Sequence, residues 1–226
     1  MKKIMLMLSM VLVLLFAVGA SATPFNFDLN TPNTAINGFT SPYATVTVDL
    51  TTSTTATITF TSKVVGGNIY LMGDGGTVAV NVNSTSWTIG DFTGSNSGTG
   101  FTPGPYSDGG AGNEDGFGSF NQTVNSFDGF THSSDSIEFV LTNTSGTWAD
   151  AASVLTFNSK NHLAAAHIFV TSNPADAANG AIVTGFASGS EIGTNGNGKV
   201  PEPATMILLG SGLLGLVGYA RRRMKK

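Results

Sequence analysis

The sequence contains no cysteine, so it offers neither disulfide bonds, nor thiolate chemistry, nor cysteine ligands for zinc. Charged residues are also scarce, at 11% of the 226 residues against about 25% in an average soluble protein. Small scaffolds below about 70–80 residues usually need disulfides or metals, whereas a longer chain can bury a sufficient apolar core. The lack of cysteine therefore excludes thiol catalysis but is compatible with export.

Positive charge is almost absent from the interior of the sequence. Seven of the ten basic residues lie at the two ends, and only Lys63, Lys160 and Lys199 lie between residues 23 and 200. Thirteen acidic residues share that stretch, which gives it a formal net charge of −10. Such a segment repels phosphate groups and anionic membrane surfaces. We therefore expect no nucleic-acid partner.

The N-terminus has the three parts of a secretory signal peptide. Two lysines follow Met1, an apolar run extends over residues 4–18, and small residues precede Thr23. Ala20 and Ala22 provide the small pair that signal peptidase requires, so residues 1–22 are predicted to be removed. Cleavage after Ala20 is an alternative. An uncleaved membrane anchor is another, which the short apolar run disfavours.

The C-terminus has the features of a membrane segment. A Gly-rich linker, residues 191–199, is followed by an apolar stretch and then by Arg221, Arg222 and Arg223. Residues 204–220 are predicted to form a transmembrane helix, about 26 Å long at ~1.5 Å per residue. The arginines would act as a stop-transfer signal and stay cytoplasmic, leaving the preceding residues outside.

Pro201-Glu202-Pro203, the Gly/Leu-rich apolar stretch and the arginine cluster together resemble the PEP-CTERM sorting signal of Gram-negative bacteria, here over residues 200–226. The resemblance implies processing near these three residues by exosortase, a membrane-embedded cysteine transpeptidase. It also implies transient anchoring in the inner membrane, followed by transfer to the cell surface or extracellular matrix, in a genome that makes exopolysaccharide. The tail is attached to many unrelated domains, so it indicates a destination and no activity. An ordinary single-pass anchor is the alternative.

Residues 23–190 are predicted to form one all-β domain, an antiparallel β-sandwich or jelly roll. Apolar and polar residues alternate over several stretches with the period of two that is typical of half-buried strands. Gly, Asn and Ser separate about eight such stretches, as in sandwiches. The side chains predicted to face inward are Val46, Val48, Ile58, Phe60, Val80, Phe139 and Leu141. One short helix is expected near residues 148–155.

Residues 94–118 differ from the rest of the domain because they contain nine glycines and two prolines. Such a composition weakens both strands and helices, so we expect a long loop. Asp108, Asn113, Glu114 and Asp115 place four oxygen-bearing side chains in this loop. Calcium binds six to eight oxygen ligands, and loop carbonyls could supply the remainder. These residues are the candidate calcium site, with solvated turns as the alternative.

No catalytic constellation is evident in the sequence, and we expect that the protein is not an enzyme. Gly94-Ser95-Asn96-Ser97-Gly98 has asparagine where a nucleophilic serine would lie. The leading hypothesis is a non-catalytic surface or matrix protein associated with exopolysaccharide and biofilm. A carbohydrate-binding module that uses aromatic residues is the first alternative. A secreted glycoside hydrolase is the second, and it requires two carboxylates that converge in a cleft.

Overall fold

The computed structural model describes residues 23–126 and 129–190, and the strands and helices in these ranges are thirteen β-strands and three short 3-10 helices. One antiparallel sheet has the order β1 (Phe25–Leu29), β3 (Ala44–Thr52), β4 (Thr55–Ser62), β11 (Ser136–Asn143) and β8 (Trp87–Ser95). The other has the order β2 (Thr31–Pro32), β13 (Val183–Gly189), β12 (Ala164–Ser172), β7 (Val78–Val80), β10 (Gly118–Asn125) and β9 (Ser107–Glu114). In addition β6 (Asn68–Met72) pairs with β12, and β5 (Val64–Val65) pairs with β6. The all-β, antiparallel prediction is confirmed.

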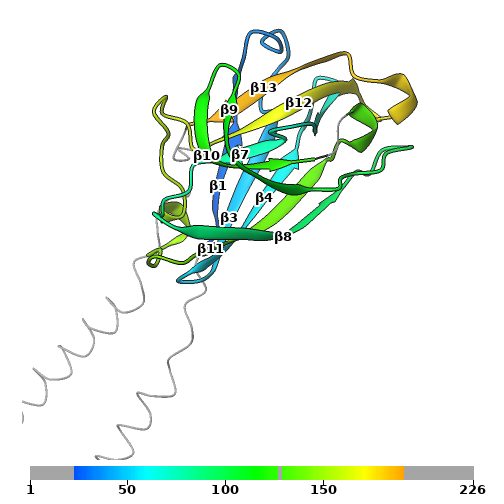
Figure 1. Cartoon of the computed structure of the whole chain (residues 1–226). Coiled ribbons are helices and arrows are strands. Elements are labelled where there is room, and N and C mark those ends of the chain that lie inside the picture. The colour runs from blue at the N-terminus through cyan, green and yellow to red at the C-terminus, as the bar shows by residue number, and fades with distance from the viewer. Residues whose placement is uncertain (1–22, 127–128, 191–226) are drawn as a thin grey trace, which may run out of the picture. The chain divides into compact units, whose positions relative to one another are not determined.

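Figure 1 shows two layers, with β8 and β11 in one and β12 and β13 in the other. One main hydrophobic core unites buried residues of both sheets. Alternate residues of β3, β4 and β11 are buried, as the period of two predicts. All seven side chains predicted to face inward belong to this core and are at most 1% exposed. Phe60 and Phe139 stack there with ring centroids 6.4 Å apart.

The outer faces of the two sheets differ. That of the five-stranded sheet consists mainly of threonine, because the outward positions of β3 and β4 alternate with their buried neighbours. The eight-stranded sheet is instead covered by the chain's own loops. Phe101 and Phe130 pack on Leu71 and Phe169 in one apolar cluster. Phe117 packs with Ala79 and Ala165 in another.

The prediction of a long loop over residues 94–118 is wrong for the second half of this segment. There β9 (Ser107–Glu114) pairs with β10. Glycine is required in this strand by close approach. A Cβ on Gly109 would clash with Thr123 Oγ1, and one on Gly112 would lie 2.7 Å from Thr123 Cγ2. Because Gly109 and Gly112 lack a Cβ, the side chain of Thr123 in β10 can pack closely against the backbone of β9.

The first half of that segment is an ordered connection. Thr99 donates its N–H to the carbonyl of Ala175, and Ala177 donates to the carbonyl of Thr99. The Asp135 carboxylate accepts bonds from the backbone and hydroxyl of Ser97, at 2.7 and 2.6 Å. These bonds fix the connection to two other loops of the described chain.

The predicted helix near residues 148–155 is reduced to a single 3-10 turn, η2 (Ala151–Ser153). Asp150 caps it by accepting a bond from Ser153 N at 2.8 Å, while the Ser153 hydroxyl accepts from Asp150 N at 3.1 Å. This reciprocal capping box satisfies backbone N–H groups at the start of the single turn. The other two 3-10 helices are η1 (Phe130–His132) and η3 (Ala177–Asn179).

All the described residues belong to one compact unit. The predicted signal peptide 1–22, linker 191–199 and transmembrane helix 204–220 lie outside the described residues. Within residues 23–126 and 129–190, no helix has the length and apolar character needed to cross a bilayer.

Candidate functional site

The structure does not bring together the four side chains of the candidate calcium site. Asp108 lies near the start of β9, Glu114 ends the strand, and Asp115 lies in the turn that follows. Six residue steps of extended chain separate Asp108 from Glu114, or about 20 Å at ~3.3 Å per residue. The prediction assumed a flexible loop that could fold around an ion, whereas a strand holds its ends apart.

Two of these carboxylates have protein partners. Asp108 Oδ1 accepts hydrogen bonds from Gln122 Nε2 at 2.7 Å and from Gly110 N at 2.8 Å. Asp115 Oδ2 accepts one from Asn33 Nδ2 at 3.0 Å. Asn113 is exposed. Among the residues that the structure describes, no group of three or more histidine and acidic side chains is arranged to hold a metal ion.

Glu114 is the unusual member of the set, because its side chain is buried at 2% exposure. Burial raises the pKa of its carboxyl group from 4.5 to about 7, and no neighbouring charge contributes to that shift. Its Oε1 atom would lie 2.6 Å from a Cβ on Gly76, whose φ is +63°. Glycine at position 76 is thus required both by the backbone conformation and by the space that the carboxyl group occupies.

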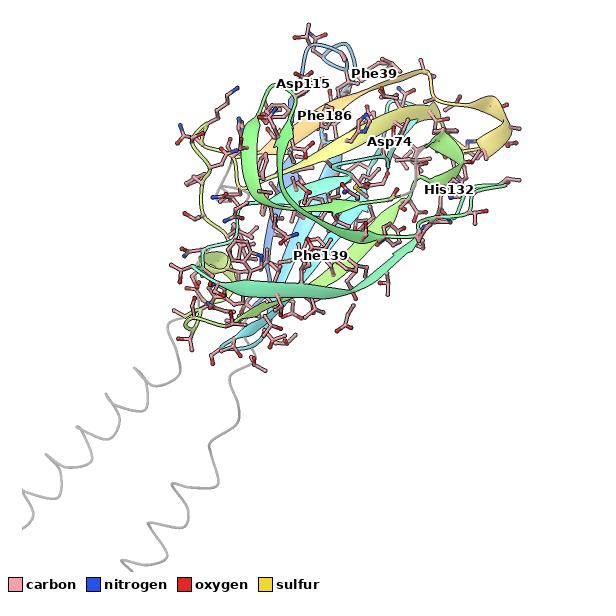
Figure 2. All side chains as sticks on the ribbon, in the orientation of Figure 1. Phe39, Asp74, Asp115, His132, Phe139 and Phe186 are labelled. Atoms are coloured by element: carbon pink, nitrogen blue, oxygen red, sulfur yellow. The ribbon has the colours of Figure 1, made fainter. Side chains whose placement is uncertain are left out.

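The turn at residues 73–77 also contacts His167, which projects from β12. Gly73 N donates to the His167 carbonyl at 3.3 Å, and His167 N donates to the Thr77 carbonyl at 3.1 Å. The His167 ring stacks on Phe186 with centroids 4.5 Å apart, and its Nδ1 lies 3.9 Å from Asp74 Oδ2. Figure 2 shows Asp74 and Phe186 at the eight-stranded sheet and Phe139 between the layers.

We call Asp74, Glu114 and His167 the acid–histidine cluster. Asp74 belongs to the 73–77 turn, the Glu114 carboxyl group lies beside Gly76 of that turn, and the backbone of His167 bonds to the turn. Burial lowers the pKa of His167, opposed by the Asp74 carboxylate and the Gly73 backbone, so the imidazole favours its neutral form. A glycoside hydrolase needs a protonated acid and a carboxylate that both reach the substrate. Glu114 has no such access in this conformation. Within the cluster, burial gives Glu114 a carboxyl group whose pKa lies near neutral pH.

The aromatic residues do not form an exposed sugar-stacking platform in the described part of the chain. Trp148 is 3% exposed and donates its Nε1–H to the Asn83 carbonyl at 2.8 Å. Trp87 and Tyr106 are half-buried against the main core, and Trp87 Nε1 donates to Gln122 Oε1 at 2.9 Å. The large hydrophobic side chains that are exposed in the described ranges are Val64, Phe157 and Ile182.

The acid–histidine cluster was not found from the sequence, because its members lie far apart along the chain. The turn signal Gly73-Asp74-Gly75-Gly76 marks one part of it. The burial of Glu114 depends on the β9–β10 pairing that the glycine content concealed. A recognisable signal is the pair Phe117, in the hairpin turn, and Phe120, in β10, because apolar residues there predict that this end of the segment is covered.

The described residues thus define an all-β protein built from two antiparallel sheets. The tail defines its sorting class: the family model described as PEP-CTERM protein-sorting motif matches residues 199–223. This range contains the predicted processing residues Pro201, Glu202 and Pro203 and the predicted stop-transfer arginines. The predicted PEP-CTERM tail is therefore confirmed. The motif implies export and membrane-associated processing by an exosortase-like enzyme.

No curated protein and no solved structure matches the chain. The matched tail residues, like the predicted signal-peptidase residues Ala20 and Ala22, lie outside the residues that the structure describes.

Proposed function

We propose that this protein is a non-catalytic component of an exopolysaccharide-rich layer, at the cell surface or in the extracellular matrix. The observation that carries the proposal is the PEP-CTERM protein-sorting motif at residues 199–223. A signal peptidase would remove residues 1–22, and an exosortase-like enzyme would then act near Pro201-Glu202-Pro203. The all-β domain, residues 23–190, is the part that reaches the layer.

The surface of the domain supports a matrix role. Its described residues carry eleven acidic side chains and two lysines, so the domain repels polyanions and stays soluble beside neutral polymers. Among the described residues, Glu114 has a carboxyl pKa raised to about 7, and this residue is buried at 2% exposure. These features favour an inert structural or binding role over hydrolysis.

Two measurements test the proposal. Fractionation of producing cells should recover the protein with the extracellular polysaccharide, and deletion of its gene should reduce the cohesion of that layer. Purified protein incubated with the extracted polysaccharide should release no new reducing ends. Recovery in the inner membrane alone, or hydrolysis that Glu114→Gln abolishes, would contradict the proposal.

A further inference from the structure

The five-stranded sheet presents an outer face of short hydroxyl-bearing side chains, which we call the threonine face. Its members include these outward residues of β1, β3, β4, β11 and β8: Asn26, Asp28, Thr45, Thr47, Asp49, Thr55, Thr57, Thr59, Thr61, Ser136, Glu138, Val140, Thr142, Thr88, Thr93 and Ser95. The set includes nine threonines and three acidic residues, and it includes no lysine, arginine or aromatic residue. Val140 is its sole apolar member.

The antiparallel register arranges these side chains in rows across the sheet. In one row, Thr47 pairs with Asn26 on one side and with Thr59 on the other, and Thr59 pairs with Glu138. Neighbouring strands lie about 4.8 Å apart, and successive outward residues lie about 6.8 Å apart along a strand. Threonine is β-branched and has few side-chain rotamers, so its hydroxyl positions are largely fixed before any ligand binds.

The threonine face is also open. Where its threonine hydroxyls form side-chain hydrogen bonds to described residues, the partners are other members of the face, for example Thr47 to Asn26 Oδ1 at 2.6 Å and Thr59 to Glu138 Oε2 at 3.1 Å. The opposite sheet is different, since Phe101, Phe117 and Phe130 cover its outer face. The threonine face is thus a broad sheet surface that the described chain leaves free.

The chemistry of this face selects among partners. Its three carboxylates, with no cation among them, repel nucleic acids and acidic polysaccharides. A stable protein interface has a largely apolar, aromatic-rich centre, which Val140 alone does not provide. Rows of hydroxyl groups that both donate and accept hydrogen bonds match a ligand that itself carries rows of hydroxyl groups.

We propose that the threonine face binds an extended, uncharged polysaccharide through hydrogen bonds between the two sets of hydroxyl groups. This inference rests on the proposed matrix function and identifies the surface that would hold the polymer. It requires no aromatic platform, in agreement with the buried or half-buried state of Trp87, Tyr106 and Trp148.

The test is retention of the full-length protein on amorphous cellulose, an uncharged extended glucan, and on polysaccharide extracted from the producing cells. The triple variant Thr47→Val, Thr57→Val and Thr59→Val removes three hydroxyl groups while keeping shape and strand propensity. We expect its affinity to fall at least tenfold, since the loss of three hydrogen bonds is enough for that change. The matched control Thr102→Val, Thr156→Val and Thr184→Val alters three exposed threonines elsewhere and should bind like the unmodified protein.

Further outcomes decide the matter. Undiminished binding by the Thr47, Thr57 and Thr59 variant, equal binding to the polyanion alginate, or no binding of the unmodified protein to either uncharged polymer would each overturn the proposal. If the triple variant fails to fold, Thr57→Arg places a long side chain at the centre of the face and should block the polymer without entering the core. C-terminal processing of these variants should be unchanged. Absence of the unmodified protein from the matrix would instead contradict the proposed function.

Discussion

Phe60 lies at the centre of the main core, where it is fully buried and stacks on Phe139. Replacing it with alanine removes most of a large apolar side chain and leaves a cavity that the two sheets cannot close. We expect Phe60→Ala to lower the free energy of unfolding by about 3–5 kcal/mol. Urea denaturation measures the change, and Thr59→Ala, which alters the opposite face of the same strand, is the control. A loss below about 1 kcal/mol for Phe60→Ala would contradict its place in the core.

Glu114 should make the stability of the domain depend on pH. An unfolded glutamate ionises near pH 4.5, whereas the buried carboxyl group in the folded protein has a pKa of about 7. Between these values the folded state retains a proton that the unfolded chain has released, so stability falls as the pH rises and the loss is complete above about pH 7. The difference between the two pKa values corresponds to about 3 kcal/mol of folding free energy.

Glu114→Gln should therefore raise the free energy of unfolding at pH 8 and change it little at pH 5, as measured by urea denaturation at both values. Asp115→Asn, which removes a charge at the next position on an exposed side chain, is the matched control and should leave the pH dependence in place. A parallel shift of Glu114→Gln at both pH values would show that its carboxyl group does not titrate in this range.

At the scale of secondary-structure elements, β9 depends on glycine for a steric reason. A Cβ on Gly112 would lie 2.7 Å from Thr123 Cγ2, closer than carbon atoms pack, whereas a Cβ on Gly90 in β8 has no atom within 4 Å. We expect Gly112→Ala to cost about 1–3 kcal/mol through overpacking and Gly90→Ala to stay within about 0.5 kcal/mol. Adding Thr123→Ser removes the clashing methyl group, keeps the hydroxyl that bonds to the Gly110 carbonyl, and should restore most of the loss. Independent, additive effects of the two substitutions would contradict this contact.

The elements predicted from the sequence are those whose two faces differ. Alternation over β3, β4 and β11 placed Val46, Ile58 and Phe139 correctly because one face of each strand meets the core and the other meets solvent. Strand β6 shows no alternation, since it is buried on both faces, and β9 has three glycines and no large apolar side chain that could alternate with polar ones. The burial of Glu114 follows from the β9–β10 pairing, so it required the tertiary structure.

At the scale of the whole molecule, the chain combines a sorting tail with a domain that is open on one broad face. Arg221, Arg222 and Arg223 lie within the matched motif and are predicted to stop transfer across the inner membrane. Replacing the three arginines with glutamine should weaken membrane retention of the unprocessed chain, because uncharged side chains cross the bilayer at a lower cost. Membrane fractionation of cells that lack the processing enzyme measures the effect. Equal retention of the two chains would show that the apolar stretch alone holds the protein.

The same tail predicts a covalent change during maturation. Trypsin cleaves after Lys199 and Arg221, so an intact tail yields one peptide of residues 200–221. Pro201 and Pro203 keep the processing segment extended and free of regular backbone hydrogen bonds, which lets an active site reach it. We expect mass spectrometry to find the 200–221 peptide in membranes and to find none of it in the mature extracellular protein. Replacing Pro201, Glu202 and Pro203 with alanine should block maturation and leave the intact tail in the membrane. Peptides covering residues 206–219 in the mature extracellular form would refute processing and identify the tail as a permanent anchor.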